Sequence, residues 1–261
     1  MRVYISTDLE GCSGITLFSQ TRDPASPLYP ESRRLLMGDI NAAVEGAVQG
    51  GATRIWVVDG HGNPMNVVPE LMHPAAEYLC GRGFPETWGL EAGFDCAFLV
   101  GYHAMNRTPD GILCHTQSSR SDARYWYHGR EYGEIGQSAM IAGHFDIPVT
   151  LVTGDGAACR EACQFLGGDV VTVAVKEGYS RECCRMLAPV RAHELIREAA
   201  REALKRVRRC QPYKVELPMP GRMERLQELL PDAPTPDNLD ELPRVVREKV
   251  FTDQLHIYDF S

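Results

Sequence analysis

The hydrophobic and polar positions of this chain alternate between two patterns. Short runs of β-branched, aromatic and aliphatic residues, such as Val3-Tyr4-Ile5, have the length and composition of buried strands. Longer segments between them carry apolar residues at helical spacing. The predicted strands cover residues 3–5, 53–58, 95–100, 147–152 and 170–175, and the predicted helices cover residues 31–50, 133–142, 156–166 and 190–208. This repetition predicts an α/β fold, with a mainly parallel sheet flanked by helices on both faces.

The pattern is less regular in three other places. Aromatic segments on both sides of His128-Gly129 predict a hairpin over residues 124–132, and residues 66–79 predict a short helix and a strand. After residue 210 the chain becomes proline-rich, with a predicted strand at Tyr213–Leu217 and one or two strands within residues 244–258. We therefore expect an α/β domain of residues 1–210 and a smaller C-terminal α+β lobe of residues 211–261.

Composition and charge restrict the possible partners. The 261 residues are 44% hydrophobic and 24% charged, and their net charge of −8 argues against nucleic acid or an anionic membrane as the main partner. The nine cysteines are scattered without CxxC spacing, so we expect reduced thiols. The chain runs from Met1-Arg2 directly into a predicted strand and has no apolar stretch of bilayer length, which predicts a cytoplasmic protein.

Two acidic residues follow the first predicted strand, in the sequence Asp8-Leu9-Glu10-Gly11. Side chains two residues apart on an extended backbone point to the same side, so these carboxylates would be neighbours. Neighbouring carboxylates repel each other, and burying them is costly unless a positive charge compensates. One or two metal ions would supply that charge. The ordinary alternative is a pair of solvated loop acids after an edge strand, and these four residues do not decide between the two.

Further candidate ligands lie just past other predicted strands. His61 and His103 each follow a buried strand, and Glu134 lies at the start of a predicted helix, where the helix dipole favours a carboxylate. In parallel sheets, ligands bind at the carboxyl ends of the strands. Three carboxylates and two histidines exceed the four ligands of a structural zinc. They suit two Zn²⁺ ions, with Co²⁺ or Mn²⁺ as possible substitutes, and Asp8 is the most central candidate for a bridging ligand.

His115 is a further candidate, because it follows the apolar residues Ile112-Leu113-Cys114. If it faces the metal ions, it could act as a general base, an acid or a nucleophile. Each candidate also has an ordinary explanation: a histidine after a strand is usually a core or loop residue, and Glu134 could merely favour its helix. Asp59 could cap the turn at Gly60-His61-Gly62 or orient a ligand histidine. Because the candidates converge on the strand ends, together they favour a metallohydrolase.

Five separated motifs carry these candidates. They are Asp8-Leu9-Glu10-Gly11, Asp59-Gly60-His61-Gly62, Gly101-Tyr102-His103-Ala104, Cys114-His115-Thr116 and Gly133-Glu134-Ile135-Gly136. In their order and approximate spacing they resemble the DppA-type zinc-dependent D-aminopeptidases. The likeness covers residues 1–210, and Lys176 is among the matching positions. Gly60 stands where that family commonly has serine, and residues 211–261 match it poorly.

The resemblance implies an activity and an assembly. It implies two Zn²⁺ ions per subunit, held by Asp8, Glu10, His61, His103 and Glu134, with His115 as the catalytic residue. The implied reaction is removal of an N-terminal D-residue, typically D-alanine, from short peptides or amides. The implied assembly is a homo-oligomer, a homodecamer of two stacked pentamers. The alternatives are a dinuclear metallohydrolase that acts on another amide or on a phosphate ester, and a scaffold without catalytic activity.

Overall fold

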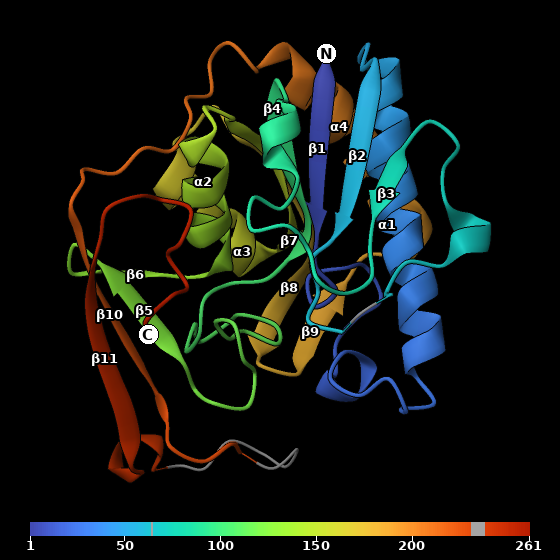
Figure 1. The fold of residues 1–261 in the computed structure, drawn as a ribbon. Helices are drawn as coiled ribbons and strands as arrows, with labels where there is room; N and C mark the ends of the chain where they lie inside the picture. Colours follow the sequence, from blue (N-terminus) through green and yellow to red (C-terminus); the bar gives the residue numbers. More distant parts are fainter. Residues whose placement is uncertain (64, 231–237) are drawn as a thin grey trace.

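A seven-stranded sheet runs through the middle of the molecule in the computed structural model, which describes residues 1–63, 65–230 and 238–261 (Figure 1). Along the sheet the strands are β3 (Glu77–Leu79), β2 (Arg54–Asp59), β1 (Arg2–Thr7), β4 (Cys96–Tyr102), β7 (Val149–Asp155), β8 (Val171–Ser180) and β9 (Cys183–Met186). Every neighbouring pair is parallel except β8 and β9. The mainly parallel sheet is therefore confirmed, with one antiparallel edge strand.

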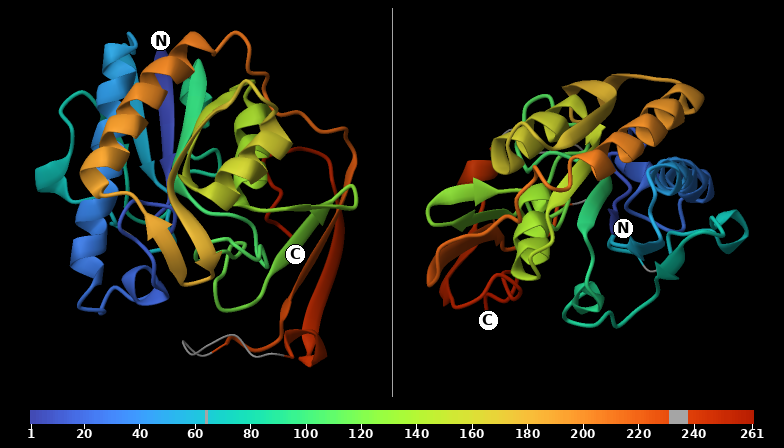
Figure 2. Two further views of the ribbon diagram at one scale, coloured as in Figure 1. Left: turned by 180° about the vertical axis from the view of Figure 1, so that it is seen from behind. Right: turned by 90° about the horizontal axis from the view of Figure 1, so that it is seen from above.

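Helices cover both faces of this sheet, as the sequence predicts. They are α1 (Tyr29–Gln49) and α4 (Pro189–Lys205) on one face, and α2 (Glu134–His144) and α3 (Gly156–Leu166) on the other. Seen from behind, α4 crosses the sheet beside α1 (Figure 2). Side chains of β1 alternate between the faces, because Val3 and Ile5 pack with the α1 side and Tyr4 packs with the α2 side. None of the described helices combines the length and hydrophobicity that crossing a bilayer requires.

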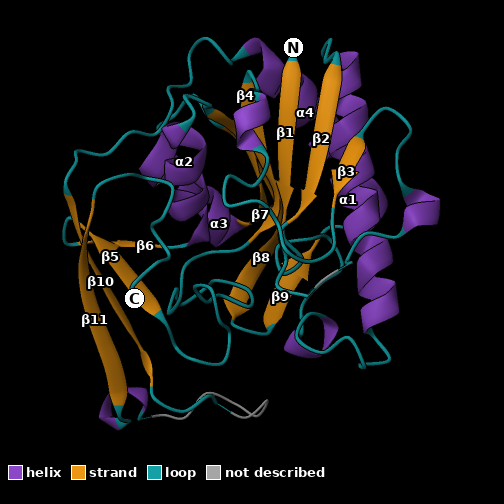
Figure 3. Ribbon diagram, in the orientation of Figure 1, coloured by secondary structure: helices purple, strands orange, loops and turns teal. Residues whose placement is uncertain are grey.

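A smaller antiparallel sheet lies beside the main one (Figure 3). Its strands are, in spatial order, β11 (Arg244–Phe251), β10 (Met219–Leu226), β5 (Arg124–Tyr127) and β6 (Arg130–Tyr132). The predicted hairpin over residues 124–132 is confirmed as β5 and β6. The strands of the C-terminal segment extend this hairpin, since β10 pairs with β5. The second sheet therefore joins segments from both sides of residue 210.

Two boundaries differ from the predictions. The strand predicted at Tyr213–Leu217 is wrong: Val215 N–H donates to the Gln254 side chain (2.9 Å), and the strand starts at Met219. Prolines at 212 and 218 explain the shift, because they have no N–H group for a ladder. The fifth predicted strand, over residues 170–175, continues to Ser180 and turns into β9. Its second half is mostly exposed, so no apolar run marked it.

Short helical turns connect the main elements. These 3₁₀ helices are η1 (Phe18–Gln20), η2 (Pro69–Leu71), η3 (Leu90–Ala92) and η4 (Leu239–Glu241). With β3, η2 confirms the short helix and strand predicted within residues 66–79. Residues 231–237, part of the acidic and proline-rich segment near the C-terminus, lie outside the described residues. None of the nine cysteines forms a disulfide bond in this structure.

Candidate metal centre

The site lies where β1, β2 and β4 end together. Thr7 pairs with Asp59 on one side and with Val100 on the other, so these strands finish at the same level. Backbone hydrogen bonds join the end of β1 to both neighbouring strands. Asp8 N–H donates to the Val100 carbonyl of β4 (2.9 Å), and Gly60 N–H, just after β2, donates to the Thr7 carbonyl (3.1 Å). The order of strands changes direction at β1, which is where doubly wound sheets bind their ligands.

Asp8 and Glu10 lie in a turn, not on extended backbone. β1 ends at Thr7, and Cys12 N–H closes a turn on the Leu9 carbonyl (3.2 Å). The two carboxylates are neighbours, as expected. A turn brings them together, however, and not an extended backbone. Gly11 makes the turn possible, because a Cβ at this position would overlap the backbone of β4 at Tyr102.

A buried lysine from β8 holds the turn in place. The Lys176 ammonium donates to the carbonyls of Glu10 (2.6 Å), Cys12 (2.9 Å) and Ile15 (2.6 Å). The side chain is 2% exposed. Three carbonyls around one ammonium satisfy all of its N–H groups, so burial is tolerated and the loop that carries Glu10 is fixed to the sheet.

All five predicted ligands come together in this structure. His61 Nδ1 lies 3.1 Å from Asp8 Oδ1 and 3.1 Å from Glu10 Oε2. His103 Nε2 lies 3.3 Å from Asp8 Oδ2 and 3.5 Å from Glu134 Oε1. These are two groups of three side chains that share Asp8, with one Asp8 oxygen directed to each group.

The separations suit tetrahedral zinc. Zinc bonds to nitrogen and oxygen of about 2.0–2.1 Å place neighbouring ligands roughly 3.3 Å apart at the tetrahedral angle. The four distances from a histidine nitrogen to a carboxylate oxygen in the two groups lie between 3.1 and 3.5 Å. Ligand atoms of Asp8, Glu10 and His103, and those of His103, His115 and Glu134, also lie within 4.8 Å of one another. His115 thus lies close enough to His103 and Glu134 to act as a metal ligand as well as a catalytic residue.

Backbone carbonyls fix the orientation of all three imidazoles. His61 Nε2 bonds to the Thr21 carbonyl (3.0 Å), His103 Nδ1 to the Ala104 carbonyl (2.9 Å) and His115 Nδ1 to the Leu113 carbonyl (2.8 Å). A carbonyl only accepts, so each of these nitrogens carries the proton in the neutral ring. The opposite nitrogen of each ring then presents its lone pair to the site, as a metal ligand must.

Unpaired polar atoms at the site provide a test of whether a metal fits. Among the described residues, Asp8 Oδ2, Glu10 Oε2 and His103 Nε2 are buried without a hydrogen-bond partner. Leaving such atoms unsatisfied costs about 1–3 kcal/mol each. All three face the same cluster, and their nitrogen and oxygen donors are those that zinc accepts. The residues present therefore fit bound metal ions.

The carboxylates and imidazoles strongly perturb each other's protonation. Burial lowers the pKa of His103, but the charges of Glu134 and Asp8 outweigh it and raise that pKa to about 9. His61 shows the same competition, because Glu10 and Asp8 hold its pKa well above the usual value against the effect of burial. Burial raises the pKa of Glu134 to about 7. Without metal ions, protons on His103, His61 and Glu134 thus reduce the negative charge of the cluster, a role that bound cations would otherwise fill.

His115 differs from the other two histidines. Its ring stacks on His103 with centroids 4.1 Å apart, and its Nε2 lies 3.8 Å from Glu134 Oε1. Burial, and next the charge of His103, lower the pKa of His115 to about 3. The ring is therefore neutral, with a lone pair directed toward the cluster.

Two contributors to the site were not predicted from the sequence as functional residues. Gln117 N–H donates to Glu134 Oε1 (2.7 Å), and Lys176 anchors the turn at Glu10. Nothing in the pattern around Gln117 marks it, because its position depends on the loop after β4.

Asp59 accepts hydrogen bonds from Asn66 N–H (2.7 Å) and from Asn66 Nδ2 (2.7 Å), and the Asn66 side-chain amide also donates to the His61 carbonyl (3.2 Å). Asp59 could either cap the turn at Gly60-His61-Gly62 or orient a ligand histidine, and these bonds favour the first role.

Comparison with known proteins places the chain in a family. The sequence model of the M55 peptidases, described as D-aminopeptidase, matches residues 1–235. The chain belongs to the M55 D-aminopeptidase family. A D-aminopeptidase of Bacillus subtilis (strain 168) is 33% identical over 215 residues, which cover 81% of this chain and 77% of that protein.

A solved structure extends the family likeness to almost the whole chain. The Zn-dependent D-aminopeptidase DppA from Bacillus subtilis, described as a self-compartmentalizing protease, superposes with a TM-score of 0.84 at 27% identity. The match covers 99% of this chain and 94% of DppA. The M55 likeness therefore continues past residue 210, where the sequence motifs end.

Proposed function

We propose that this chain is a zinc-dependent aminopeptidase that removes N-terminal D-residues, of the D-alanine type, from short peptides or amides. The observation that carries the proposal is the pair of ligand groups sharing Asp8, with one carboxylate oxygen directed to each. Two cations that share a bridging ligand are a recurring device for hydrolysis. Membership of the M55 family supports the activity, and the zinc dependence of DppA supports the metal.

In this proposal the chain supplies two ligand sets. Asp8, Glu10 and His61 would hold one zinc ion, and Asp8, His103 and Glu134 would hold the other. Bound zinc would polarise the scissile carbonyl and lower the pKa of a water molecule. Lys176 and Gln117 keep the ligand carboxylates in position through the Glu10 carbonyl and the Glu134 side chain. These contacts reduce the movement that metal binding would otherwise have to suppress.

His115 is the proposed catalytic residue. With its Nδ1–H held by the Leu113 carbonyl, its Nε2 can accept a proton or attack the scissile carbonyl carbon. Its ring is fixed against His103, so the lone pair stays directed toward the place where a substrate carbonyl would lie. A cavity of about 260 Å³, lined by Asp8, His61, His115 and Ser118 among others, gives a short peptide access to these groups.

A substrate panel on zinc-loaded protein tests the proposal. We expect hydrolysis of D-Ala-p-nitroanilide, slower hydrolysis of L-Ala-p-nitroanilide and no comparable turnover of bis-p-nitrophenyl phosphate. Faster turnover of the phosphate ester would favour the alternative phosphodiesterase function, and equal turnover of the D and L substrates would remove the stereochemical claim. Fewer than one transition-metal ion per chain in the purified protein, without turnover, would favour a non-catalytic scaffold.

The same proposal includes the assembly and the compartment. We infer a homo-oligomer, a homodecamer of two stacked pentamers, which acts in the cytoplasm. The description of DppA as a self-compartmentalizing protease supports an enclosing assembly. The α/β domain of residues 1–210 carries the proposed ligands, and the C-terminal lobe of residues 211–261 adds strands to its β5–β6 hairpin.

A further inference from the structure

A buried and bent loop, residues 112–117, carries His115. Residues 112–115 are at most 8% exposed. Leu113 has a φ of 51° and Gln117 a φ of 64°, so a residue in the left-handed region lies on each side of His115. Residues other than glycine adopt this conformation at a cost in free energy, and it persists only where neighbouring contacts fix it. The contacts that hold this loop therefore decide where the His115 ring lies.

Asp155 holds the start of the loop. This residue ends β7, where Gly154 pairs with Tyr102 of β4, so its carboxyl group lies at the sheet edge that carries the metal centre. Its Oδ2 accepts from Ile112 N–H (2.7 Å), and the residue is 0% exposed. A buried N–H group without its acceptor is costly, so this bond fixes the loop to the sheet.

Helix capping alone does not explain Asp155. The residue is the N-cap of α3, and its Oδ1 accepts from Ala158 N–H (2.8 Å). That bond needs a single acceptor oxygen, which serine also supplies at an N-cap. The other carboxylate oxygen is used for Ile112, 43 residues away in the chain. A carboxylate, unlike a hydroxyl, serves both contacts at once.

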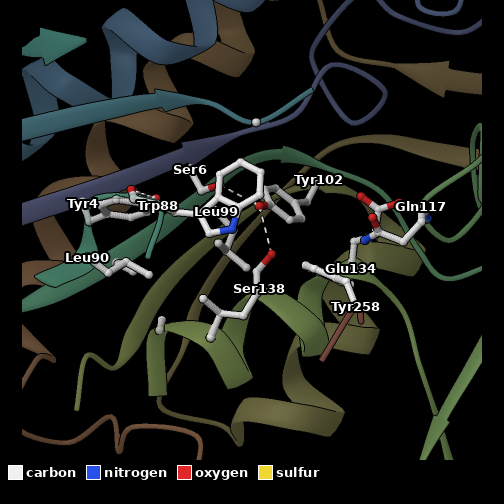
Figure 4. A pocket seen from close by; sticks show the side chains of 14 residues that line it. Tyr4, Ser6, Trp88, Leu90, Leu99, Tyr102, Gln117, Glu134, Ser138 and Tyr258 are labelled. Atoms are coloured by element: carbon white, nitrogen blue, oxygen red, sulfur yellow. Dashed lines mark hydrogen bonds between the residues drawn. The ribbon is translucent and has the colours of Figure 1, made fainter. Parts of the chain in front are cut away.

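Other contacts hold the middle and the end of the loop. Leu113 N–H donates to the carbonyl of Arg181 (2.8 Å), in the turn between β8 and β9, and Arg181 Nε donates to the Cys114 carbonyl (3.1 Å). At the far end, Gln117 N–H donates to Glu134 Oε1 (2.7 Å), and these two side chains lie together at one end of the pocket drawn in Figure 4. The far end is thus tied to a proposed metal ligand, whereas the start is tied to Asp155.

We propose that Asp155 is a positioning residue for His115 and acts through the backbone of this loop. The inference rests on the proposed aminopeptidase function, in which His115 Nε2 acts on the substrate. The bond to Asp155 fixes Ile112, and the carbonyl of the next residue, Leu113, holds His115 Nδ1 (2.8 Å). Loss of the anchor lets the imidazole shift while every proposed metal ligand remains. A misplacement of about 1 Å can lower the rate by about 100-fold.

Asp155→Ser and Asp155→Ala separate the anchor from the helix cap. Both lose the bond to Ile112 N–H, but serine still caps α3 and alanine does not. With D-Ala-p-nitroanilide we expect the same loss of kcat in both, about 10–100-fold, with little change in KM and with two zinc ions per chain. Tm should be lower for Asp155→Ala than for Asp155→Ser. If Asp155 were only a cap, kcat would follow Tm and the serine variant would resemble wild type.

Hydrogen–deuterium exchange, resolved to single amides, provides a readout that needs no activity. Exchange of the Ile112 amide should accelerate about tenfold in both variants, because its buried acceptor is lost. Exchange of the Ala158 amide should accelerate only in Asp155→Ala. Asp155→Asn keeps the size of the side chain and tests the proposal if the smaller residues do not fold. Its one carbonyl oxygen replaces either Oδ1 or Oδ2, so kcat should follow the protection of the Ile112 amide, whichever bond it keeps.

Cys163→Gly is the matched control. Cys163 is an exposed residue of α3, and glycine in a helix interior weakens the helix while Asp155 keeps both of its bonds. This variant should have a lower Tm and unchanged kcat. An equal loss of kcat in Cys163→Gly would assign the effect to the stability of α3 and overturn the positioning role.

The remaining outcomes distinguish this inference from the function on which it rests. Unchanged exchange of the Ile112 amide in Asp155→Ser, wild-type kcat despite faster exchange, or loss of zinc from this variant would overturn the positioning role and leave the aminopeptidase function standing. Zinc-loaded wild-type protein that does not hydrolyse D-Ala-p-nitroanilide would overturn both.

Discussion

Three buried atoms without hydrogen-bond partners, Asp8 Oδ2, Glu10 Oε2 and His103 Nε2, explain why metal ions fit this site. In a folded protein such atoms are normally satisfied, and each exception calls for a physical cause. Two cations that share Asp8 would satisfy all three atoms, while protons on the histidines do so only in part. At the scale of single residues, protons and metal ions therefore compete for the same buried atoms.

This competition predicts that zinc binding depends on pH. His103 in the metal-free protein holds a proton below its raised pKa of about 9, and Glu134 holds one below about 7. Zinc must displace these protons, so affinity should fall as the pH drops below about 9 and fall more steeply below about 7. Calorimetry in buffers of different ionisation enthalpy measures the released protons directly. Zinc binding without proton release at pH 7 would contradict the protonation of the cluster.

The role of His115 can be separated from metal binding. We expect His115→Ala to retain both zinc ions and to lose about 10²–10⁴ in kcat, since it removes a proton acceptor or nucleophile beside the ions. His144→Ala is the matched control, because this histidine is exposed at the end of α2. Metal content by mass spectrometry accompanies the kinetics. Loss of zinc in His115→Ala would make the residue a ligand, and full turnover would remove its catalytic role.

At the scale of elements, β8 supports the turn that follows β1. Lys176→Met should leave the carbonyls of Glu10, Cys12 and Ile15 without their donor, although its side chain is of similar length. We expect zinc affinity to fall about 10–100-fold, as for other residues that orient ligands, together with a lower Tm. Lys205→Met on the exposed end of α4 is the control. Unchanged zinc affinity in Lys176→Met would show that the turn holds its shape without the lysine.

The sequence predicts the elements of the main sheet well, because their patterns are local. The buried strands β1, β2, β4 and β7 each have a short apolar run, and α1 and α4 each show helical spacing. The polar second half of β8 and the start of β10 at Met219 could not be predicted in this way. Those boundaries depend on pairing with other strands, with β9 (Cys183–Met186) for β8, and with β11 (Arg244–Phe251) and the distant β5 (Arg124–Tyr127) for β10.

The candidate site shows the same division between local and distant information. Asp8, His61 and His103 could be proposed from the sequence because each lies within two residues of the end of a strand. The roles of Gln117 and Lys176 depend on where a loop and a distant strand come to lie in the folded chain. Contacts of this kind leave no periodic pattern around the residues that make them.

At the scale of the whole molecule, the proposed assembly gives a simple prediction. Sedimentation velocity on the purified full chain should show a discrete species well above the mass of the 29.0 kDa monomer, and ten times that mass for a decamer. The self-compartmentalizing description of DppA is the basis for this expectation. A monomer at micromolar concentration would contradict the assembly, whereas the metal centre, built from one chain, would remain as proposed.

The central claim is that Asp8 joins two zinc ions in one site. Anomalous scattering, recorded on both sides of the zinc absorption edge from crystals of the protein as purified, tests it most directly. We predict two peaks per chain, one contacted by Asp8, Glu10 and His61 and the other by Asp8, His103 and Glu134. A single peak, or an Asp8 carboxylate that contacts only one ion, would contradict the account.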